Sequence, residues 1–255
     1  MIKQLPNFFT LLNLFFGCLA IVCGLQPGLI VAARPDGQLY VDVPEKLWMV
    51  SLFIALAAVV DFLDGFLARA LHADSAMGKQ LDSLADLVSF GVAPALLIYH
   101  FLRLSWAQDP SAMELGSMLL WPAFILPLAA AWRLARFNLA PASLHVFRGL
   151  PVPAAGLFIA SLPVLYWRAD KEWLISLLLN SYFLYALIAL LSSLMISSIP
   201  LLTLKFSSFS WASNKPRYLL ILLSLVAIVS LQWLALPIII ILYVLLSLLF
   251  KNQLT

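Results

Sequence analysis

Charged side chains are scarce in this sequence. Lys, Arg, Asp and Glu make up only 11% of its 255 residues, whereas an ordinary soluble domain carries about a quarter. Hydrophobic residues make up 64%, and the mean hydropathy is +1.02. This composition excludes an ordinary soluble domain and is typical of an integral membrane protein. We therefore expect membrane lipids, and no nucleic acid, among the partners of the chain.

Cysteine is almost absent as well. The only two cysteines, Cys18 and Cys23, lie five residues apart in the first apolar run. They do not face each other on a helix, so the pair indicates helix packing and neither a disulfide nor a metal site. Residues 1–25 also lack the small-residue cleavage site of a signal peptide, and further apolar runs follow them. We interpret this segment as the first membrane helix.

The apolar runs predict the fold class, an all-α integral membrane protein. A transmembrane helix needs about 20 apolar residues, because lipid offers no partner to free backbone polar groups. The length therefore predicts about eight transmembrane helices, or seven if Pro237 only kinks a single last helix. The expected helices are residues 6–24, 47–69, 80–102, 117–137, 153–167, 174–204, 218–233 and 237–250. Around the Pro-Asp-Gly of residues 35–37 we expect a small β-hairpin on the outer face.

The distribution of charge predicts the orientation. Placing the amino terminus in the cytoplasm leaves ten of the 15 Lys and Arg residues on the cytoplasmic side, as the positive-inside rule requires. Both termini are then cytoplasmic, and we expect the plasma (inner) membrane. Seven of the 12 acidic residues fall in outer loops, and the other five all lie within residues 61–86. A site built on that segment opens toward the cytoplasm.

The chain is organised around residues 58–91, which hold four aspartates in an otherwise apolar region. Asp61 and Asp64 are three residues apart, and Asp82 and Asp86 are four apart, so on helices each pair projects from one face. A helical hairpin could direct both pairs to one point. One ionised carboxylate inside the membrane costs about 2.5 to 3.5 kcal/mol, so a cation must hold them. Mg²⁺ and Mn²⁺ prefer such oxygen ligands, together with substrate phosphate.

This reading gives the aspartates different roles. One or two divalent ions would neutralise and position a diphosphate and stabilise a leaving phosphate, while Asp86, one turn deeper than Asp82, is our candidate for the base that deprotonates an attacking hydroxyl. An alternative is the ion path of a cation-coupled transporter. Another is a set of salt bridges to Arg69, Arg133 and Arg136. The serines of the segment have no nearby His-Asp pairing, so we expect no covalent intermediate.

The first helix carries a polar stripe. Asn7 lies at its start, and Thr10, Asn13 and Gly17 follow at intervals of three or four residues. A stripe of small and polar residues serves helix packing in many membrane proteins. Ligand contact is the other interpretation, and the sequence does not decide between the two.

A basic cluster lies at the cytoplasmic ends of the fourth and fifth expected helices. It consists of Arg133, Arg136 and Arg148, with Asn138 nearby. Such a cluster suits an acceptor that carries a carboxylate or a phosphate and suits the cation choline poorly. The positive-inside rule alone is a competing explanation for each of these arginines.

The central segment resembles a known signature. Its residues match, at every spacing, the D-x2-D-G-x2-A-R-x8-G-x3-D-x3-D motif of the CDP-alcohol phosphotransferase family. The resemblance implies a membrane enzyme with a six-helix core, usually a homodimer, that moves a phosphatidyl group from CDP-diacylglycerol to an alcohol and releases CMP. It implies two divalent ions held by Asp61, Asp64 and Asp82, with Asp86 as a further ligand or the base. The CDP contacts that it implies are Asp61, Gly65, Arg69 and Gly78.

Three further stretches resemble the phosphatidylserine synthase branch of that family. They are PNFFTLLNLFFGCLAI near the start, RLARFN at 133–138 and FRGLPVPAAG at 147–156. The resemblance implies L-serine as the acceptor; a sister enzyme using glycerol 3-phosphate or inositol phosphate is the alternative. The implied acceptor-binding residues are Arg133, Arg136, Asn138, Arg148, Gly149, Leu150 and Pro151. We expect a catalytic core in residues 1–170 and further transmembrane helices in residues 171–255 that complete the bundle.

Overall fold

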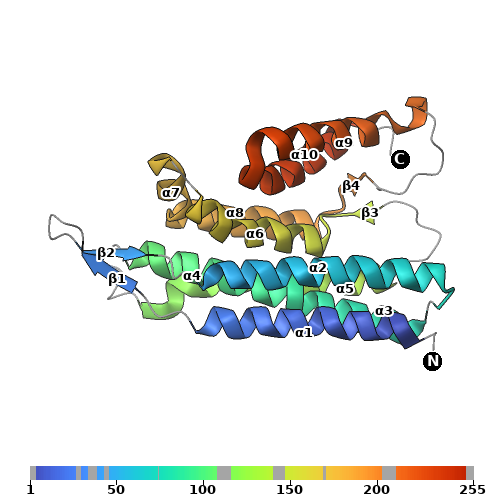
Figure 1. The fold of residues 1–255 in the computed structure, drawn as a ribbon, viewed down its shortest axis with the longest axis horizontal. Coiled ribbons are helices and arrows are strands. Elements are labelled where there is room, and N and C mark those ends of the chain that lie inside the picture. Colours follow the sequence, from blue (N-terminus) through green and yellow to red (C-terminus); the bar gives the residue numbers. More distant parts are fainter. Residues whose placement is uncertain are drawn as a thin grey trace.

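A computed structural model describes residues 4–26, 30–33, 39–42, 46–73, 75–107, 116–139, 147–168, 171–202 and 211–250. Within these ranges the chain is a bundle of long helices that run back and forth along one axis (Figure 1). Two short two-stranded sheets lie at the ends of the bundle. The prediction of an all-α membrane protein is confirmed.

The first two helices form one side of the bundle. Helix α1 (Leu5–Leu25) packs along α2 (Leu47–Ala70), and between them β1 (Ile30–Ala33) pairs antiparallel with β2 (Leu39–Asp42). The expected hairpin is thus present, although its Pro-Asp-Gly turn lies outside the described residues. The face of α1 that is buried carries only small or polar residues and one proline: Pro6, Thr10, Asn13, Gly17, Ala20 and Gly24.

The third expected helix is longer than predicted and is interrupted by a wider turn. Helix α3 (Ala76–Asp86) begins at Ser75, whose hydroxyl accepts a hydrogen bond from the Gly78 amide at 2.9 Å. A π-helical turn, η2 (Leu87–Val92), follows Asp86 directly and leads into α4 (Ala93–Trp106). Such turns are rare and occur often at functional sites.

The fourth and fifth helices follow the prediction closely. The fourth begins as a 3₁₀ segment, η4 (Gly116–Phe124), which contains Pro122, and continues as α5 (Ile125–Leu139). The fifth is α6 (Val152–Trp167). Before α6, strand β3 (Phe147–Arg148) pairs antiparallel with β4 (Pro200–Leu201), which brings residues far apart in the sequence together at one end of the bundle.

The prediction of one helix over residues 174–204 is wrong. The chain forms α7 (Glu172–Leu178) and α8 (Ser181–Ile196), which meet at an angle of 63°. The side chain of Asn180 accepts a hydrogen bond from the Phe183 amide at 3.0 Å and starts the second helix as its N-cap. The helix ends at Ile196, before Pro200, which has no amide hydrogen to donate.

The last two helices are separate. Of the two expected numbers of helices, seven and eight, the described residues therefore support eight. Helix α9 (Trp211–Leu231) and α10 (Ala235–Leu249) are joined by the short 3₁₀ turn η5 (Gln232–Leu234), where Gln232 has a φ of 47°. Leu220 of α9 packs with Leu246 of α10 and with Leu202. The two helices therefore form a hairpin rather than one kinked helix (Figure 1).

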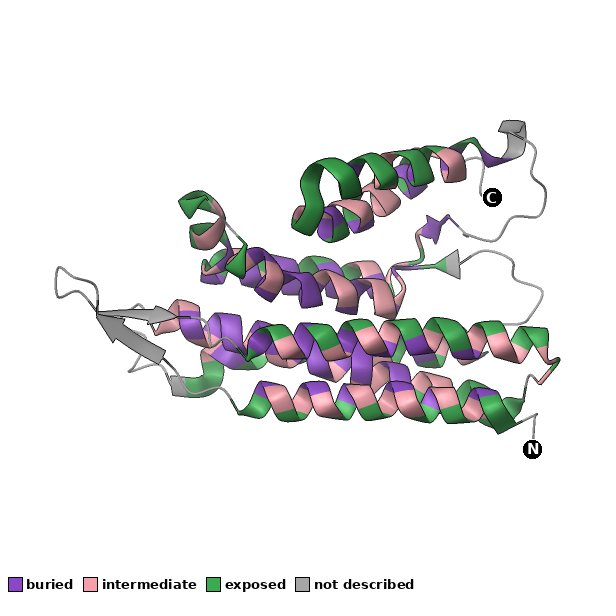
Figure 2. Cartoon of the chain, in the orientation of Figure 1, coloured by how far each residue is buried: buried purple, intermediate pink, exposed green. Residues whose placement is uncertain are grey.

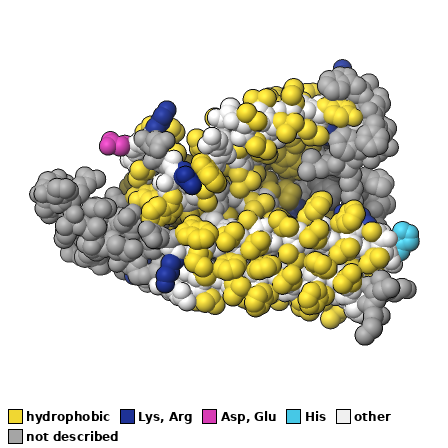
Figure 3. All heavy atoms as spheres, viewed as in Figure 1, with side chains coloured by type: hydrophobic (Ala, Val, Ile, Leu, Met, Phe, Trp, Pro, Cys, Tyr) yellow, Lys and Arg dark blue, Asp and Glu magenta, His cyan; other side chains and the backbone are white. Residues whose placement is uncertain are grey.

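The surface of the bundle is apolar. In Figure 2 many helices show an exposed stripe and a buried stripe, and Figure 3 shows hydrophobic side chains covering most of one face over the helices. By length and composition, five described helices could each cross a membrane, or six if α7 and α8 form one bent span. Helix α6 is apolar but has only 16 residues, so it is not among these five. Helices α9 and α10 are included in the five as a single stretch. The chain is an integral membrane protein.

The two ends of the bundle differ in what they carry. The start of α1, the α2–α3 turn, the end of α5, the β3–β4 pair and the end of α10 share one end (Figure 1). The β1–β2 hairpin and α7 lie at the opposite end. The first of these two ends, which we call the site end, holds the four aspartates.

Candidate metal and phosphate site

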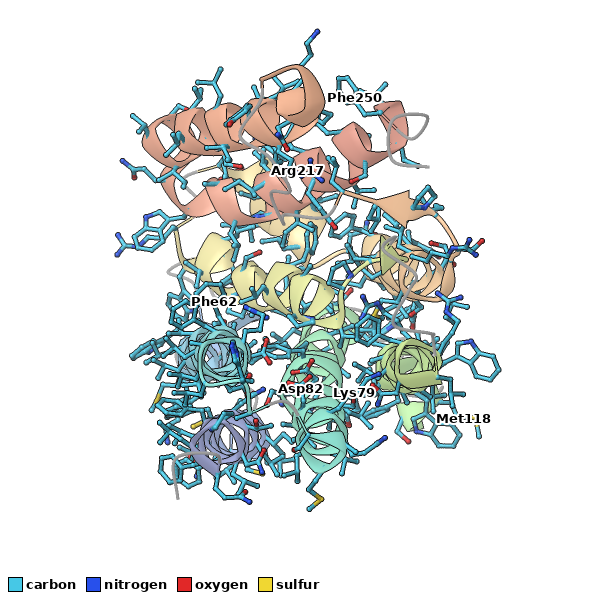
Figure 4. The ribbon with its side chains drawn as sticks, turned by 90° about the vertical axis from the view of Figure 1, so that its right-hand side faces the viewer. Phe62, Lys79, Asp82, Met118, Arg217 and Phe250 are labelled. Atoms are coloured by element: carbon cyan, nitrogen blue, oxygen red, sulfur yellow. The ribbon has the colours of Figure 1, made fainter. Side chains whose placement is uncertain are left out.

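The four aspartates lie on two helices that meet at the site end. Asp61 and Asp64 belong to the last turns of α2, and Asp82 and Asp86 to α3, which begins six residues after α2 ends. Figure 4 looks onto this end and shows Asp82 at the centre of the bundle, among the helices of the first half. The hairpin predicted from the sequence is therefore present.

Three of the aspartates form a compact group. Asp61, Asp64 and Asp82 each offer a carboxylate oxygen, and these three atoms all lie within 4.8 Å of one another. Asp64 is only 5% exposed, and its buried Oδ2 has no hydrogen-bond partner among the described residues. Like charges this close repel, and a buried anion without a partner is costly. The group therefore fits a hard divalent cation such as Mg²⁺ or Mn²⁺, whose identity the residues do not distinguish.

Asp86 lies one turn further along α3 than Asp82 and adjoins this group. Its carboxylate interacts with those of Asp61 and Asp82 and is 7% exposed. Its Oδ1 accepts a hydrogen bond from the amide Nδ2 of Asn13, on α1, at 3.3 Å. Thr10, one turn earlier on α1, contacts Asp64 with its side chain. The polar stripe of the first helix thus faces the aspartates.

The residues expected at the CDP part lie around the mouth of the site. Gly65 and Arg69 continue α2 beyond Asp64, and the Arg69 side chain is exposed. Gly78 lies in the first turn of α3, where a Cβ atom would come within 3.0 Å of both Asn7 Oδ1 and Ser75 Oγ. The side chain of Asn7 also donates to Gln4 Oε1 at 2.8 Å. A side chain at position 78 would therefore crowd Asn7 and Ser75, and glycine lets both of them approach the first turn of α3.

Arg133 is the expected acceptor residue that lies closest to the aspartates. It is 6% exposed, although it is a cation, and its buried Nε has no hydrogen-bond partner among the described residues. Its charge interacts with Asp86 on one side and with Tyr243 of α10 on another. A buried guanidinium with a free N–H group suits an anionic group on a ligand.

Arg136 and Asn138 make contacts within the protein. The guanidinium of Arg136 donates to the carbonyl oxygens of Ile196 and Ser197, both at 2.8 Å, and so caps the end of α8. The Asn138 side chain donates to Ser83 Oγ at 2.8 Å, while its buried Oδ1 has no partner among the described residues. Lys79 donates to the Asn138 carbonyl at 3.2 Å, which ties α3 to the end of α5.

The other expected acceptor residues surround the end of α8. Arg148 is exposed, and Pro151 precedes the first residue of α6. Gly149 has a φ of 76°, and its amide donates to the Ile199 carbonyl at 2.9 Å. A Cβ atom here would lie 2.5 Å from the Met195 carbonyl oxygen, so only glycine fits. Buried Leu150 donates from its amide to the Leu194 carbonyl at 2.9 Å.

The sequence did not identify two residues near the site. Tyr243 of α10 interacts with Arg133, and its hydroxyl donates to the Leu202 carbonyl at 3.0 Å. Ser89 donates from its hydroxyl to the Asn13 carbonyl at 3.0 Å. Tyr243 stands in a continuous apolar run with no motif around it, so only the packing of the last hairpin reveals it. Ser89 follows Asp86 by three residues, and that spacing was the available signal.

Comparison with known proteins supports the same interpretation of the central motif. The sequence profile of the CDP-alcohol phosphatidyltransferase family matches residues 3–247. The chain is also similar to proteins named CDP-diacylglycerol--serine O-phosphatidyltransferase. One from Mycobacterium leprae is 36% identical over 183 residues, which are 69% of this chain and 54% of that protein.

Two other organisms also have relatives with the same name. One from Bacillus subtilis is 37% identical over 115 residues, 45% of this chain and 60% of that protein. One from Methanocaldococcus jannaschii is 34% identical over 145 residues, 57% of this chain and 59% of that protein. The chain thus spans little more than half the length of these relatives.

Proposed function

Because the chain belongs to the CDP-alcohol phosphatidyltransferase family, we propose that it is an enzyme that transfers a phosphatidyl group from CDP-diacylglycerol to L-serine. The serine hydroxyl forms a new bond to the lipid-side phosphorus, the bond from that phosphorus to CMP breaks, and the hydroxyl proton leaves with a base. The observation that carries this proposal is the convergence of carboxylate oxygens of Asp61, Asp64 and Asp82 within 4.8 Å of one another where α2 and α3 meet. The names of the relatives support serine as the acceptor.

We assign the metal ligands to Asp61, Asp64 and Asp82, with Asp86 next to them as a further ligand. When bound there, one or two Mg²⁺ or Mn²⁺ ions would neutralise the diphosphate and stabilise the phosphate of the departing CMP. The protein residues fix the position of the substrate: Gly65 and Gly78 let it approach the backbone, and Arg69 supplies a cation at the mouth. Asp86, which lies beside Arg133, takes the proton from the acceptor hydroxyl.

We assign the acceptor pocket to the neighbourhood of Arg133. This guanidinium is buried, has a free N–H group and lies beside Asp86, so it can hold a serine carboxylate near the base. The wall of this pocket lies around the end of α8 and consists of Arg136, Arg148, Gly149 and Pro151. Asn138 joins that wall to α3. A cationic acceptor such as choline fits this charge poorly.

The remaining assignments concern the whole chain. We propose that residues 1–170 carry the catalytic core and that residues 171–255 complete the bundle. We also propose a homodimer in the plasma (inner) membrane with the site end toward the cytoplasm. Mass measurement of the detergent-solubilised protein by light scattering tests the dimer, and a purely monomeric species would contradict it.

CMP release by the purified protein tests the reaction. CDP-diacylglycerol and Mn²⁺ or Mg²⁺ are supplied with serine, glycerol 3-phosphate, inositol phosphate or choline in separate reactions. We expect metal-dependent release with serine. Asp82→Ala should abolish it, whereas Glu172→Ala, an exposed acid at the opposite end, should leave it unchanged. Release with another alcohol alone would keep the family and overturn the acceptor, and ion uptake into vesicles without CMP release would favour a transporter.

A further inference from the structure

Asn13 connects the first helix to Asp86, the aspartate at the end of α3. It is completely buried, with 0% exposure, in the middle of α1. Burying a primary amide is unfavourable unless its hydrogen-bonding groups find partners. The partner of its Nδ2 is the Asp86 carboxylate, 73 residues further along the chain. A residue that served only helix packing could be a small apolar one, such as Ala20 on the same face of α1.

Two bonds hold Asn13 to the segment around Asp86. Its side-chain amide donates to Asp86 Oδ1 at 3.3 Å, and its backbone carbonyl accepts a bond from Ser89 Oγ at 3.0 Å. One turn later on α1, Gly17 lies so close to Ser89 that a Cβ atom would be 3.0 Å from the Ser89 Cα. The two backbones are therefore in close contact one turn from Asn13.

The backbone around Asp86 explains why this contact matters. Asp86 is the last residue of α3, and the π-helical turn η2 starts directly after it. Asp86 itself keeps regular helical dihedral angles, with φ −59° and ψ −41°, and wider turns of this kind occur often at functional sites. The contact that Asn13 supplies therefore reaches Asp86 at the junction between α3 and the wider turn.

The chemistry of an amide suits this place better than that of a cation. Arg133 already interacts with the charge of Asp86, and a second cation bonded to Asp86 from α1 would compete with the metal for that charge. The neutral amide occupies one carboxylate oxygen and leaves the charge available on the other. Asn13 Oδ1 has no hydrogen-bond partner among the described residues, and in the opposite amide orientation this oxygen would face the carboxylate and repel it. The negative charge of Asp86 thus requires that Asn13 Nδ2 be the group that faces it, as the donor.

We propose that Asn13 is a positioning residue: its amide holds Asp86 Oδ1 so that the second oxygen of Asp86 faces the Asp61–Asp64–Asp82 cluster. This inference rests on the proposed function for its catalytic meaning. Its structural claim concerns metal binding and can be tested without turnover.

A double-mutant cycle that measures Mn²⁺ affinity tests the proposal. Mn²⁺ binding to the purified full-length protein is titrated by electron paramagnetic resonance for wild type, Asn13→Ala, Asp86→Ala and the double variant. We expect Asn13→Ala to weaken Mn²⁺ binding about tenfold, the lower end for loss of a group that orients a metal ligand. In the Asp86→Ala background the same substitution should change the affinity by less than about twofold, because its effect passes through Asp86.

Two further variants exclude a general structural effect. Asn13→Leu keeps the volume of the side chain but removes the donor, and it should weaken Mn²⁺ binding as Asn13→Ala does. Ser51→Ala removes a buried hydroxyl of α2 that has no partner among the described residues, and it should bind Mn²⁺ as wild type does. All variants must elute as a single folded species in detergent.

Two results would overturn the proposal. One is wild-type Mn²⁺ affinity in Asn13→Ala, and the other is an equal loss of affinity in both backgrounds. CMP release measured on the same samples separates this inference from the proposed function. A wild-type protein that binds Mn²⁺ through Asp86 and Asn13, yet releases no CMP with any alcohol, would retain the inference and refute the function.

Discussion

At the scale of single residues, the site depends on side chains that are unfavourable where they stand. Asp64 and Asp86 are almost fully buried, and Arg133 is a buried cation. Each ionised group inside a membrane costs several kcal/mol unless it is paired. The bundle brings these costs together at one place, where a divalent ion and a substrate phosphate can offset the repulsion among the carboxylates. Without a cation, the repulsion among these carboxylates lowers the stability of the site end.

Gly149 gives a prediction at the same scale. Its φ of 76° and the carbonyls of Met195 and Ser197, 2.5 and 2.8 Å from the place of a Cβ atom, leave no room for a side chain. Gly149→Ala should therefore lower the free energy of unfolding by about 1 to 3 kcal/mol. Unfolding of the purified protein in mixed micelles, with increasing denaturing detergent, measures this loss.

The matched control is another glycine-to-alanine substitution. At Gly24, near the end of α1, a Cβ atom would meet its nearest neighbours at 3.8 Å, which is ordinary contact. Gly24→Ala should leave the free energy of unfolding unchanged or raise it by up to about 1 kcal/mol, since alanine favours the helix. Equal stability of the two variants would show that the close approach at Gly149 has been misjudged.

At the scale of elements, α3 is the helix whose start matters most, because it carries both Asp82 and Asp86. Ser75 caps it by accepting a bond from the Gly78 amide at 2.9 Å. Ser75→Ala should cost about 1 kcal/mol of helix stability and allow the first turn of α3 to open more often. Hydrogen exchange at the Gly78 amide should become faster, while exchange in α8 should not change.

Ser75→Asn is the control for this prediction. Asparagine caps helices as well as serine does, so the Gly78 amide of this variant should exchange at nearly the wild-type rate. If Ser75→Ala also exchanges like wild type, the cap does not limit the opening of α3.

The helices show which parts of the fold local sequence patterns predict and which they do not. Most expected helices are present with shifts of a few residues at their ends, because long apolar runs bounded by polar loops leave little choice in a membrane. The break between α7 and α8 was missed, although Asn180 followed by Ser181 is an N-cap signal within the run. The π-helical turn after Asp86 had no signal in the local sequence pattern.

The site also has features that the sequence predicts and features that only the folded chain shows. The spacing of the four aspartates sufficed to predict that they converge, because helical geometry places residues three or four apart on one face. The bonds from Asn13 to Asp86 and from Arg136 to Ile196 join residues 73 and 60 positions apart. No local pattern shows such pairs. Arg136 is therefore a residue whose capping role only the folded chain reveals.

At the scale of the whole molecule, the two ends of the bundle differ in charge. Lys and Arg side chains gather at the site end more than at the other, as expected if the site end faces the cytoplasm. The described ones at the site end are Arg69, Lys79, Arg133, Arg136, Arg148, Lys215 and Arg217, and those at the opposite end are Lys46, Arg103, Arg168 and Lys171. A soluble acceptor and the released CMP would then exchange directly with the cytoplasm.

This orientation predicts which positions a membrane-impermeant maleimide can reach in intact cells. In a chain whose Cys18 and Cys23 are replaced by alanine, single cysteines are placed at Met77, 64% exposed in the first turn of α3, or at Glu172, exposed at the start of α7. We expect Glu172→Cys to be labelled in intact cells and Met77→Cys only after the cells are opened. Labelling of both in opened membranes is the control for access. The reverse pattern in intact cells would place the aspartates on the outer side, away from a cytoplasmic supply of CDP-diacylglycerol and serine, and would contradict the proposed reaction together with the orientation.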